Sequence, residues 1–263
     1  MKKINVAIAG LGNVGSSLIQ SIEENNNYFK NKKSLEINIV GISAKSKNKK
    51  RGINITNYNW FDNPVDMVDL KDCDVIIELI GQEKGISYEL IKLALNNNKH
   101  VVTGNKALIA NHGYELFELA EKNSLALSFE AAVAGGIPII KTIKNDIALN
   151  NINKISGILN GTTNYILTKM EEDNLSFDKV LDIAKDKGFT SDNEAHLDIG
   201  GYDAAHKLTI LSTLAFGSKL NFNHNYIEGI SNVKIEDINF ARQLGYKIKL
   251  ISESSIIDNQ ISN

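Results

Sequence analysis

The chain has 263 residues, of which 43% are hydrophobic and 23% charged, and its formal net charge is −2. This length allows one large domain or two modest ones, and the composition is ordinary for a globular protein. A net charge near zero gives no electrostatic basis for a nucleic-acid or membrane-surface partner. The single cysteine, Cys73, excludes a disulfide framework. No apolar run approaches the roughly 20 residues of a membrane span, and the N-terminus does not resemble a signal peptide, so we expect a cytoplasmic protein.

The first half of the chain alternates short apolar runs with amphipathic segments. We expect strands at 4–9, 36–42, 74–80, 100–103 and 125–129, and helices at 14–28, 88–97 and 114–122. This alternation predicts an α/β fold, a doubly wound parallel sheet of the Rossmann type with helices on both faces. The alternation ends near the glycine pair Gly135-Gly136. We therefore predict a first domain over residues 1–135.

Longer helices dominate the second half. We expect a strand at 152–159 and helices at 163–171, 176–187 and 202–216, the first of these capped by Thr162 or Asn160. Residues 235–250 indicate a helix followed by a strand, and residues 251–263 are largely polar. These elements predict an α+β domain over residues 136–263.

A glycine motif follows the first expected strand and opens the first expected helix, with the sequence Gly10-Leu11-Gly12-Asn13-Val14-Gly15. In that context the pattern G-x-G-x-x-G is typical of dinucleotide binding. Gly10 permits the tight turn, Gly12 lets the backbone approach a pyrophosphate, and Gly15 packs helix against strand. The N–H groups at the helix start, around Asn13 and Val14, would hold the phosphates. The alternative is a tight turn without a ligand.

The residues after the second expected strand bear on which dinucleotide binds. An NAD enzyme commonly has an acid there, about 20 residues after the glycines, to bind the ribose 2′-hydroxyl. This chain has no acid in Ser43-Ala44-Lys45-Ser46-Lys47. Because a lysine can neutralise a 2′-phosphate, Lys45 favours NADP, with NAD as the other possibility. The lysines from Lys47 to Lys50 are better interpreted as a solvated loop.

Four longer segments carry more information than the glycines: TGNKALIA at 103–110, FEAAVAGGIPII at 129–140, GILNGTTNYIL at 157–167 and GYDAAHKL at 201–208. In their order and approximate spacing they resemble homoserine dehydrogenase. The resemblance implies NAD- or NADP-dependent interconversion of L-homoserine and L-aspartate 4-semialdehyde, in threonine and methionine biosynthesis. It also implies that the second domain binds substrate and forms a homodimer through the 152–159 strand.

The resemblance assigns the chemistry to three side chains. Lys207 matches the proton-transfer lysine, and Asp203 lies one helical turn before it on the same face. Lys106 matches a second active-site lysine, near both nicotinamide and substrate, and Thr103 and Gly188 join it at the cofactor. Without the resemblance, Asp203 and Lys207 would be interpreted as an ordinary surface ion pair.

An amino-acid substrate also needs an anion for its ammonium group and donors for its carboxylate. Asp198 matches the family aspartate that binds the ammonium, and the resemblance assigns Asp203 to the substrate as well. The family glutamate of G-[YF]-x-E is absent, and a one-residue insertion after Gly188-Phe189-Thr190 places Asp192 at its position. Glu194 is the other candidate for this role. Thr162, at a helix start, is the candidate donor to the substrate carboxylate.

Glu130, Val133, Gly135 and Ile137 match the family site for a monovalent cation, Na⁺ or K⁺. One carboxylate and three backbone carbonyls form the oxygen shell that a hard cation prefers. The alternative is an ordered hinge between domains that needs no ion. His206 adjoins Lys207, but neighbours on a helix point about 100° apart, so we expect a structural role for it.

Two alternatives to the dehydrogenase remain. The family's catalytic domain continues beyond the last residue of this chain, so one alternative is a nucleotide-binding fragment without catalysis. The other is aspartate-semialdehyde dehydrogenase, which needs a cysteine nucleophile on its substrate domain. Cys73 instead lies in the expected nucleotide domain, before a buried strand.

Overall fold

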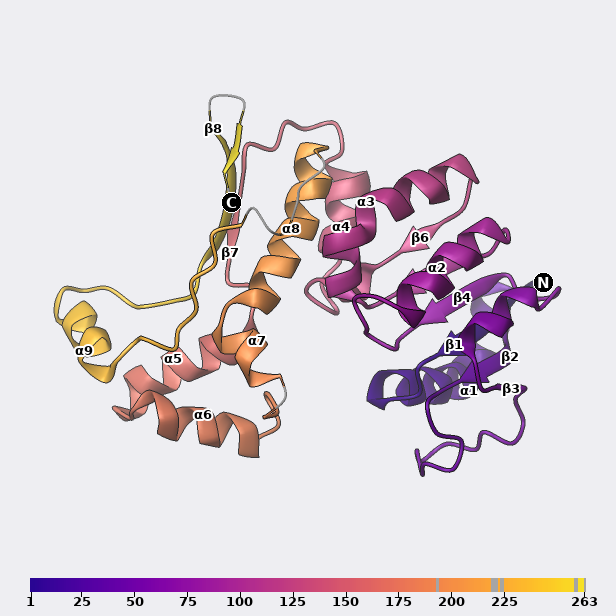
Figure 1. Ribbon diagram of the computed structural model, residues 1–263, viewed down its shortest axis with the longest axis horizontal. Helices are drawn as coiled ribbons and strands as arrows, with labels where there is room; N and C mark the ends of the chain where they lie inside the picture. Colours follow the sequence, from indigo (N-terminus) through magenta and orange to yellow (C-terminus); the bar gives the residue numbers. More distant parts are fainter. Residues whose placement is uncertain (193, 219–221, 223–224, 258–259, 263) are drawn as a thin grey trace. The chain divides into compact units, whose positions relative to one another are not determined.

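The computed structural model describes residues 1–263 except 193, 219–221, 223–224, 258–259 and 263 (Figure 1). The chain divides into two units, residues 1–140 and 141–263. Each unit has its own sheet and its own hydrophobic core. In the part of the chain that is described, no helix combines the length and apolar character needed to cross a membrane.

The first unit is built on a six-stranded sheet in the order β3-β2-β1-β4-β5-β6, and every neighbouring pair is parallel. Its strands are β1 Lys2–Ala9, β2 Leu35–Ser43, β3 Trp60–Phe61, β4 Val75–Glu78, β5 His100–Thr103 and β6 Leu127–Ser128. The strand order reverses between β1 and β4, and open α/β sheets bind ligands at the carboxyl ends of the strands beside such a reversal. Ala9, Glu78 and Thr103 lie side by side at that edge.

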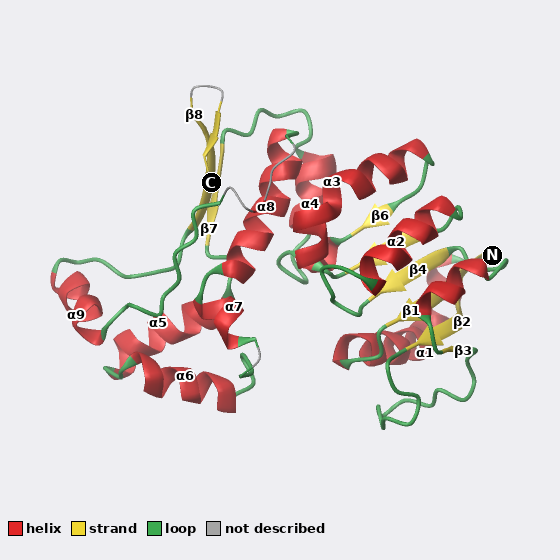
Figure 2. Ribbon diagram, viewed as in Figure 1, coloured by secondary structure: helices red, strands yellow, loops and turns green. Residues whose placement is uncertain are grey.

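Three long helices cover this sheet (Figure 2): α1 Asn13–Lys33, α2 Ile86–Asn96 and α3 Lys106–Lys122. The chain crosses from β1 to β2 in one direction and from β4 through β5 to β6 in the other. Because such crossovers are right-handed, α1 covers one face while α2 and α3 cover the opposite face. Short 3₁₀ turns, η1 Pro64–Asp69 and η2 Glu130–Ala132, complete the unit. The doubly wound parallel sheet predicted from the sequence is confirmed.

Apolar side chains of β1, β2 and β4 pack against α1 in a fully or nearly fully buried cluster that includes Val6, Ile8, Ile19, Ile22, Ile42 and Ile77. The strands forming this core are nearly continuous apolar runs because both of their faces are covered. Burying each such side chain stabilises the fold by about 1.5–3 kcal/mol. This core therefore provides a rigid edge on which the loops after β1, β4 and β5 are held.

The second unit combines helices with a three-stranded antiparallel sheet in the order β7-β8-β9. Its elements, after α4 Ile139–Lys141 at the junction, are η3 Thr142–Asp146, β7 Lys154–Gly157, α5 Gly161–Asp173, α6 Phe177–Asp186, α7 Ala195–Ile199, α8 Tyr202–Phe216, α9 Ile235–Gln243, β8 Ser252–Ile257 and β9 Gln260–Ser262. Helix α5 packs against α6, α7 and α9, and α8 packs against β8. The core between the helices includes Ile166, Leu167, Met170, Val180, Ala184, Ile230 and Ile238.

Two expectations about individual elements were wrong, and two strands had not been predicted. Helix α3 begins at Lys106 rather than 114, because the Asn105 side chain caps it by accepting a hydrogen bond from the Leu108 N–H. The strand expected before residue 251 is absent from this described segment, since Ile248 and Leu250 instead pack against the α5 core. Strands β8 and β9 form in the largely polar segment 251–263, for which no element was predicted.

Candidate functional site

The glycine motif forms the turn between β1 and α1. Gly10 has φ +99°, and a Cβ there would lie 2.4 Å from the Leu79 carbonyl carbon and oxygen. A Cβ on Gly15 would lie 1.9 Å from the Gly10 oxygen. At Gly12, by contrast, a Cβ would meet nothing within 4 Å. The turn itself therefore requires Gly10 and Gly15, whereas the open space beside Gly12 is what a closely approaching ligand needs.

The start of α1 faces the same space. Gly12 is the N-cap of α1 and makes no side-chain cap hydrogen bond. Asn13 and Val14 are exposed. An uncapped helix N-terminus presents backbone N–H groups and a positive dipole end, which suit a phosphate anion. The residues at this turn thus fit a dinucleotide pyrophosphate.

A buried carboxylate organises the neighbouring loop. Glu78, at the end of β4, is fully buried. Its Oε1 accepts hydrogen bonds from the Ile80 N–H at 2.9 Å, the Gly81 N–H at 3.0 Å and the Ser87 hydroxyl at 2.9 Å. Its Oε2 accepts from the Thr103 hydroxyl at 2.6 Å. Glu78 therefore links the loop after β4, the start of α2 and the end of β5.

The same network reaches Lys106. The Thr103 hydroxyl accepts a hydrogen bond from the Asn105 N–H at 3.0 Å. The Asn105 side chain donates to the Gln82 carbonyl at 2.7 Å and caps α3. Lys106 is the next residue and the first of α3. Thr103 and Lys106, predicted as cofactor residues, are thus held together at the carboxyl edge of the sheet. Sequence reasoning missed Glu78, although an acid inside an apolar strand is itself a signal.

The basic loop after β2 lies against the glycine turn. Lys45 is exposed. Arg51, to which the sequence analysis gave no role, donates to the Leu11 carbonyl at 3.1 Å and to the Lys49 carbonyl at 2.9 Å. Its guanidinium also lies 5.8 Å from the ring centroid of Trp60. Arg51 therefore connects the loop that carries Lys45 to the glycine turn. No local sequence pattern predicts this contact, because Arg51 and Leu11 are far apart in the chain.

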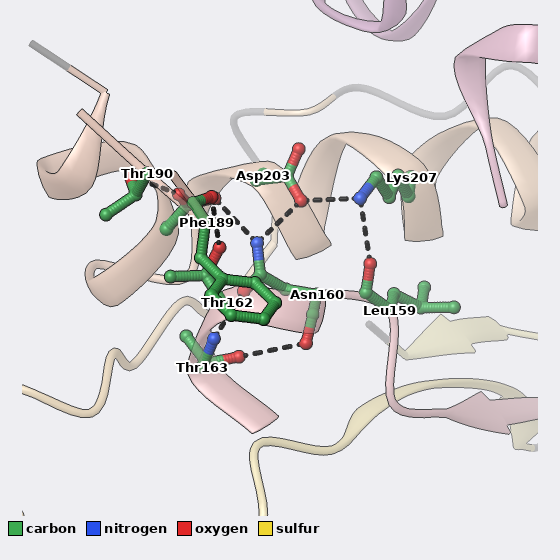
Figure 3. Close-up of polar contacts among 9 residues, drawn as sticks. Leu159, Asn160, Thr162, Thr163, Phe189, Thr190, Asp203 and Lys207 are labelled. Carbon is green, nitrogen blue, oxygen red and sulfur yellow. Dashed lines mark hydrogen bonds and ion pairs between the residues drawn. The ribbon is translucent and has the colours of Figure 1, made fainter. Parts of the chain in front are cut away.

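In the second unit, Lys207 and Asp203 form a largely buried ion pair on α8 (Figure 3). The Lys207 Nζ lies 2.6 Å from Asp203 Oδ2 and donates to the Leu159 carbonyl at 2.9 Å. The side chain of Asp203 is 6% exposed and that of Lys207 19%. An exposed i, i+4 pair would be fully solvated, whereas this pair is held in place from two sides. The arrangement differs from the ordinary surface ion pair that spacing alone would suggest.

Asn160 joins this pair to a second carboxylate (Figure 3). Its Nδ2 donates to Asp203 Oδ2 at 2.8 Å and to Asp198 Oδ1 at 2.7 Å. Its Oδ1 accepts from the Thr163 N–H at 2.7 Å, which caps α5. Thr190 donates to the other oxygen of Asp198 at 2.8 Å. The structure thus brings Asp198, Asp203 and Lys207 together around Asn160, for which the sequence suggested only a helix cap.

The remaining predicted substrate residues lie in the segments around this group. Thr162 is nearly buried, and its hydroxyl donates to the Phe189 carbonyl at 3.1 Å. Gly188 adopts φ +75° at the end of α6. Asp192 forms an ion pair with Lys185 at 2.8 Å, and its side chain is 86% exposed. The hydrogen bond from Lys185 lowers the pKa of the Asp192 carboxyl.

Glu194, the other candidate for the missing glutamate, accepts a hydrogen bond from the Ser191 hydroxyl at 3.2 Å. Asp192 and Glu194 are therefore engaged locally, by Lys185 and by Ser191. Asp198, in contrast, lies in the Asn160 group beside Asp203. Among Asp198, Asp192 and Glu194, the bonds found in the described residues connect only Asp198 to the Lys207–Asp203 pair, and they do so through Asn160.

The predicted cation residues lie in one turn-rich segment. Glu130 Oε1 accepts from the Ile140 N–H at 3.0 Å, and the Ile137 carbonyl accepts from the Ile139 N–H at 2.8 Å. Ala134 and Gly136 have positive φ angles, and the Ile137 N–H donates to the Ala134 carbonyl at 2.8 Å, which closes a turn in this segment. Each carbonyl oxygen has a second lone pair, so the donor set fits a hard cation. Across the described residues no group of three or more His, Cys, Asp or Glu could hold a metal ion.

Cys73 and His206 have structural surroundings. Cys73 is 4% exposed and donates to the Val75 carbonyl, and burial raises the pKa of its thiol. A buried, protonated thiol is a poor nucleophile, which disfavours the aspartate-semialdehyde dehydrogenase alternative. The His206 ring stacks on Phe222 with centroids 4.2 Å apart. This contact agrees with the structural role expected for His206.

Comparisons with known proteins identify the family. The model for the homoserine dehydrogenase NAD-binding domain matches residues 10–130, and the homoserine dehydrogenase model matches residues 138–262. The chain is 43% identical over 251 residues to the homoserine dehydrogenase of Neisseria gonorrhoeae. The aligned region covers 95% of this chain and 57% of that protein. The chain thus spans little more than half the length of this relative.

Solved structures agree with these matches. The homoserine dehydrogenase of Thiobacillus denitrificans is 40% identical with a TM-score of 0.92, over 99% of this chain and 60% of that one. A hyperthermophilic archaeal homoserine dehydrogenase in complex with NADPH is 26% identical with a TM-score of 0.81, over 99% of this chain and 81% of that one. With two family models that together span nearly all of its length, this chain belongs to the homoserine dehydrogenase family, whose members are NAD(P)-dependent oxidoreductases.

Proposed function

We propose that the protein containing this chain interconverts L-homoserine and L-aspartate 4-semialdehyde with NAD(P), a step that serves threonine and methionine biosynthesis. The observation that carries the proposal is the Lys207–Asp203 pair, largely buried and held by the Leu159 carbonyl and by Asn160. An ammonium fixed in this way is suited to proton transfer at one defined position.

The residues divide the reaction between them. When bound, oxidised NAD(P) would supply the acceptor for the hydride that leaves the hydroxyl-bearing carbon of homoserine. As the hydride leaves, the neutral amine of Lys207 takes the hydroxyl proton, and in the reverse direction its ammonium returns a proton to the aldehyde oxygen. Asp203 positions Lys207. Lys106, in the first unit, contacts cofactor and substrate in this proposal.

The substrate's own charges require separate partners. We assign its ammonium to Asp198, with Asp192 as a second carboxylate that would first have to leave Lys185. Its carboxylate is assigned to Thr162 at the N-terminus of α5, where the helix dipole favours an anion. Replacing Asp198 by Asn should raise the KM for homoserine more than it lowers kcat, which steady-state kinetics would show. An unchanged KM would remove Asp198 from the ammonium site.

For the cofactor we propose binding at the glycine turn by Gly10, Gly12, Asn13, Val14 and Gly15. Thr103 and Lys106 would complete the part of the site in the first unit, and Gly188 is proposed separately as a cofactor residue of the second unit. NADP is preferred in this proposal because Lys45 follows β2, and a family member has been solved with NADPH. Replacing Lys45 by Ala should raise the KM for NADPH and leave that for NADH nearly unchanged. Equal losses with both cofactors would refute the 2′-phosphate assignment.

The glycine turn and the start of α1 also support a second candidate function, nucleotide binding without catalysis. Both candidates bind NADPH, which raises the fluorescence of the reduced nicotinamide, but only a dehydrogenase consumes it when aspartate 4-semialdehyde is added. Comparing binding with turnover in the same sample therefore separates the two.

We also propose a homodimer formed through the sheet of the second unit. Strand β7 is an edge of that sheet, and an unpaired strand edge is a template for pairing with another chain. Light scattering should show a mass twice that of the chain. A monomer at the highest attainable concentration would contradict the proposal.

A monovalent cation at Glu130 and the carbonyls of Val133, Gly135 and Ile137 is the last part of the proposal. The oxygen donor set supports it, as does the turn that gathers these residues in one segment. The midpoint temperature of thermal unfolding should then be higher in K⁺ or Na⁺ than in a large organic cation at equal ionic strength. This difference in midpoint should vanish in Glu130→Gln. Equal midpoints in all three salts would refute the site.

A further inference from the structure

Asn160 connects two carboxylates and one helix (Figure 3). Its side chain is nearly buried at the residue before α5. Both of its N–H protons point to carboxylates, one to Asp198 and one to Asp203, and its oxygen accepts from the Thr163 N–H. Both N–H groups of the Asn160 amide therefore donate a hydrogen bond.

The charge arrangement explains why an amide suits this position. Asp198 and Asp203 approach the same nitrogen, at 2.7 and 2.8 Å, and two carboxylates so close together repel each other. The amide supplies a proton to each without adding charge. With the Lys207 ammonium, the three charges sum to −1, which leaves the group able to attract one further cation. A lysine or arginine in place of Asn160 would cancel that charge.

We propose that Asn160 is a positioning residue of the dehydrogenase site, which fixes Asp203 for Lys207 and at the same time fixes Asp198 for the substrate ammonium. The inference rests on the proposed function. It makes Asn160 the connection between the proton-transfer step and the ammonium site. The helix cap is then its second role.

Two substitutions separate positioning from capping. Asn160→Asp and Asn160→Ser both keep an oxygen that can cap α5, because Asp, Ser and Asn are comparable N-caps. Neither can donate to both acids, and Asn160→Asp adds a third carboxylate to the group. The control is Asn164→Asp, which makes the same chemical change on the same helix, where the Asn164 side chain accepts a hydrogen bond from Lys249.

Kinetics provide the first measurement. Losing a hydrogen bond to a charged group corresponds to about a 10- to 100-fold effect. We expect kcat to fall by this factor in Asn160→Ser and Asn160→Asp, and to stay unchanged in Asn164→Asp. In Asn160→Asp the rise of kcat for homoserine oxidation should also move to higher pH, because the extra carboxylate stabilises the protonated form of Lys207. If Asn160 served only as a cap, both variants would keep the parent kcat and pH profile, and the proposal would be overturned.

A second measurement does not require turnover, so the inference can fail separately from the proposed function. Urea unfolding followed from about pH 7 to about pH 4 should show Asn160→Asp destabilised at the higher pH and recovering at the lower pH, as protonation relieves the crowded carboxylates. Asn164→Asp should show no such recovery. A destabilisation of Asn160→Asp that does not change with pH would mean that Asn160 does not join Asp198 to Asp203. Lack of activity in the parent chain would instead count against the proposed function.

Discussion

Glu78 is the residue whose replacement tests the cofactor side of the account most sharply. Its buried carboxylate accepts four hydrogen bonds, three on Oε1 and one, from Thr103, on Oε2. In Glu78→Gln the amide oxygen can keep the three bonds to Oε1. The amide NH₂ takes the place of Oε2 and cannot accept the hydrogen bond that the Thr103 hydroxyl donates in the parent protein. The substitution therefore removes one charge-assisted bond, which contributes about 1.5–3 kcal/mol. Glu78→Ala would leave the buried hydroxyls of Ser87 and Thr103 unpaired, at about 1–3 kcal/mol each, and would also free the part-buried N–H groups of Ile80 and Gly81.

Urea unfolding and NADPH titration together provide the assay. Ser87→Ala and Thr103→Val each remove one hydroxyl from the same carboxylate, but Ser87 leads to α2, whereas Thr103 leads through Asn105 to the start of α3. We expect similar losses of unfolding free energy, with weaker NADPH binding only in Thr103→Val and Glu78→Gln. An unfolding free energy of Glu78→Gln within about 0.5 kcal/mol of the parent, as for a neutral surface change, would refute the reasoning. Equal losses of NADPH affinity in Ser87→Ala and Thr103→Val would refute the assigned path.

Three further predictions concern other parts of the chain. Lys207→Ala should lower kcat by about 10²- to 10⁴-fold with NADPH binding unchanged, whereas His206→Ala should keep most of the turnover; the reverse pattern would remove Lys207 as the proton carrier. Gly12→Ala should keep the unfolding free energy of the parent chain but bind NADPH weakly in a fluorescence titration. Gly15→Ala should lose stability as well, because its Cβ would lie 1.9 Å from a backbone oxygen. Normal NADPH binding by Gly12→Ala would place the cofactor elsewhere. Burial raises the pKa of Cys73, so the native thiol stays protonated as the pH passes about 8.5, where the unfolded thiol ionises. The free energy of unfolding should therefore fall above that pH, and a disulfide reagent should react rapidly only with the unfolded protein. Rapid reaction with the native protein at neutral pH would contradict the burial of Cys73.

The sequence was informative where the physical requirement is local. The glycine turn could be predicted because the Gly10 conformation and the Gly15 contact involve residues a few positions apart. The parallel sheet could be predicted because strands covered on both faces are continuous apolar runs. Asn160 shows the opposite case, since its two acids are 38 and 43 residues away in the chain. No local pattern distinguishes an asparagine that caps a helix from one that also holds two carboxylates.

Strand β8 escaped prediction for a related reason. The side chains of Ser252 and Ser254 are buried while Glu253, between them, is exposed, so the strand alternates as an antiparallel strand should. The buried face carries serines rather than apolar side chains, and hydrophobic periodicity therefore gives no signal. The start of α3 was missed although Asn105 is a favoured N-cap residue, because Asn111 and Gly113 lower the helix propensity of the turns that follow.

The most direct test of the proposed activity follows the transferred hydrogen. The chain would be incubated with aspartate 4-semialdehyde and NADPH carrying deuterium at the transferable position of the nicotinamide, and the product would be analysed by mass spectrometry. The account predicts homoserine that carries one deuterium on the hydroxyl-bearing carbon, in amounts equal to the NADPH consumed. Tight NADPH binding without any labelled homoserine would contradict it and leave the chain as a nucleotide-binding unit.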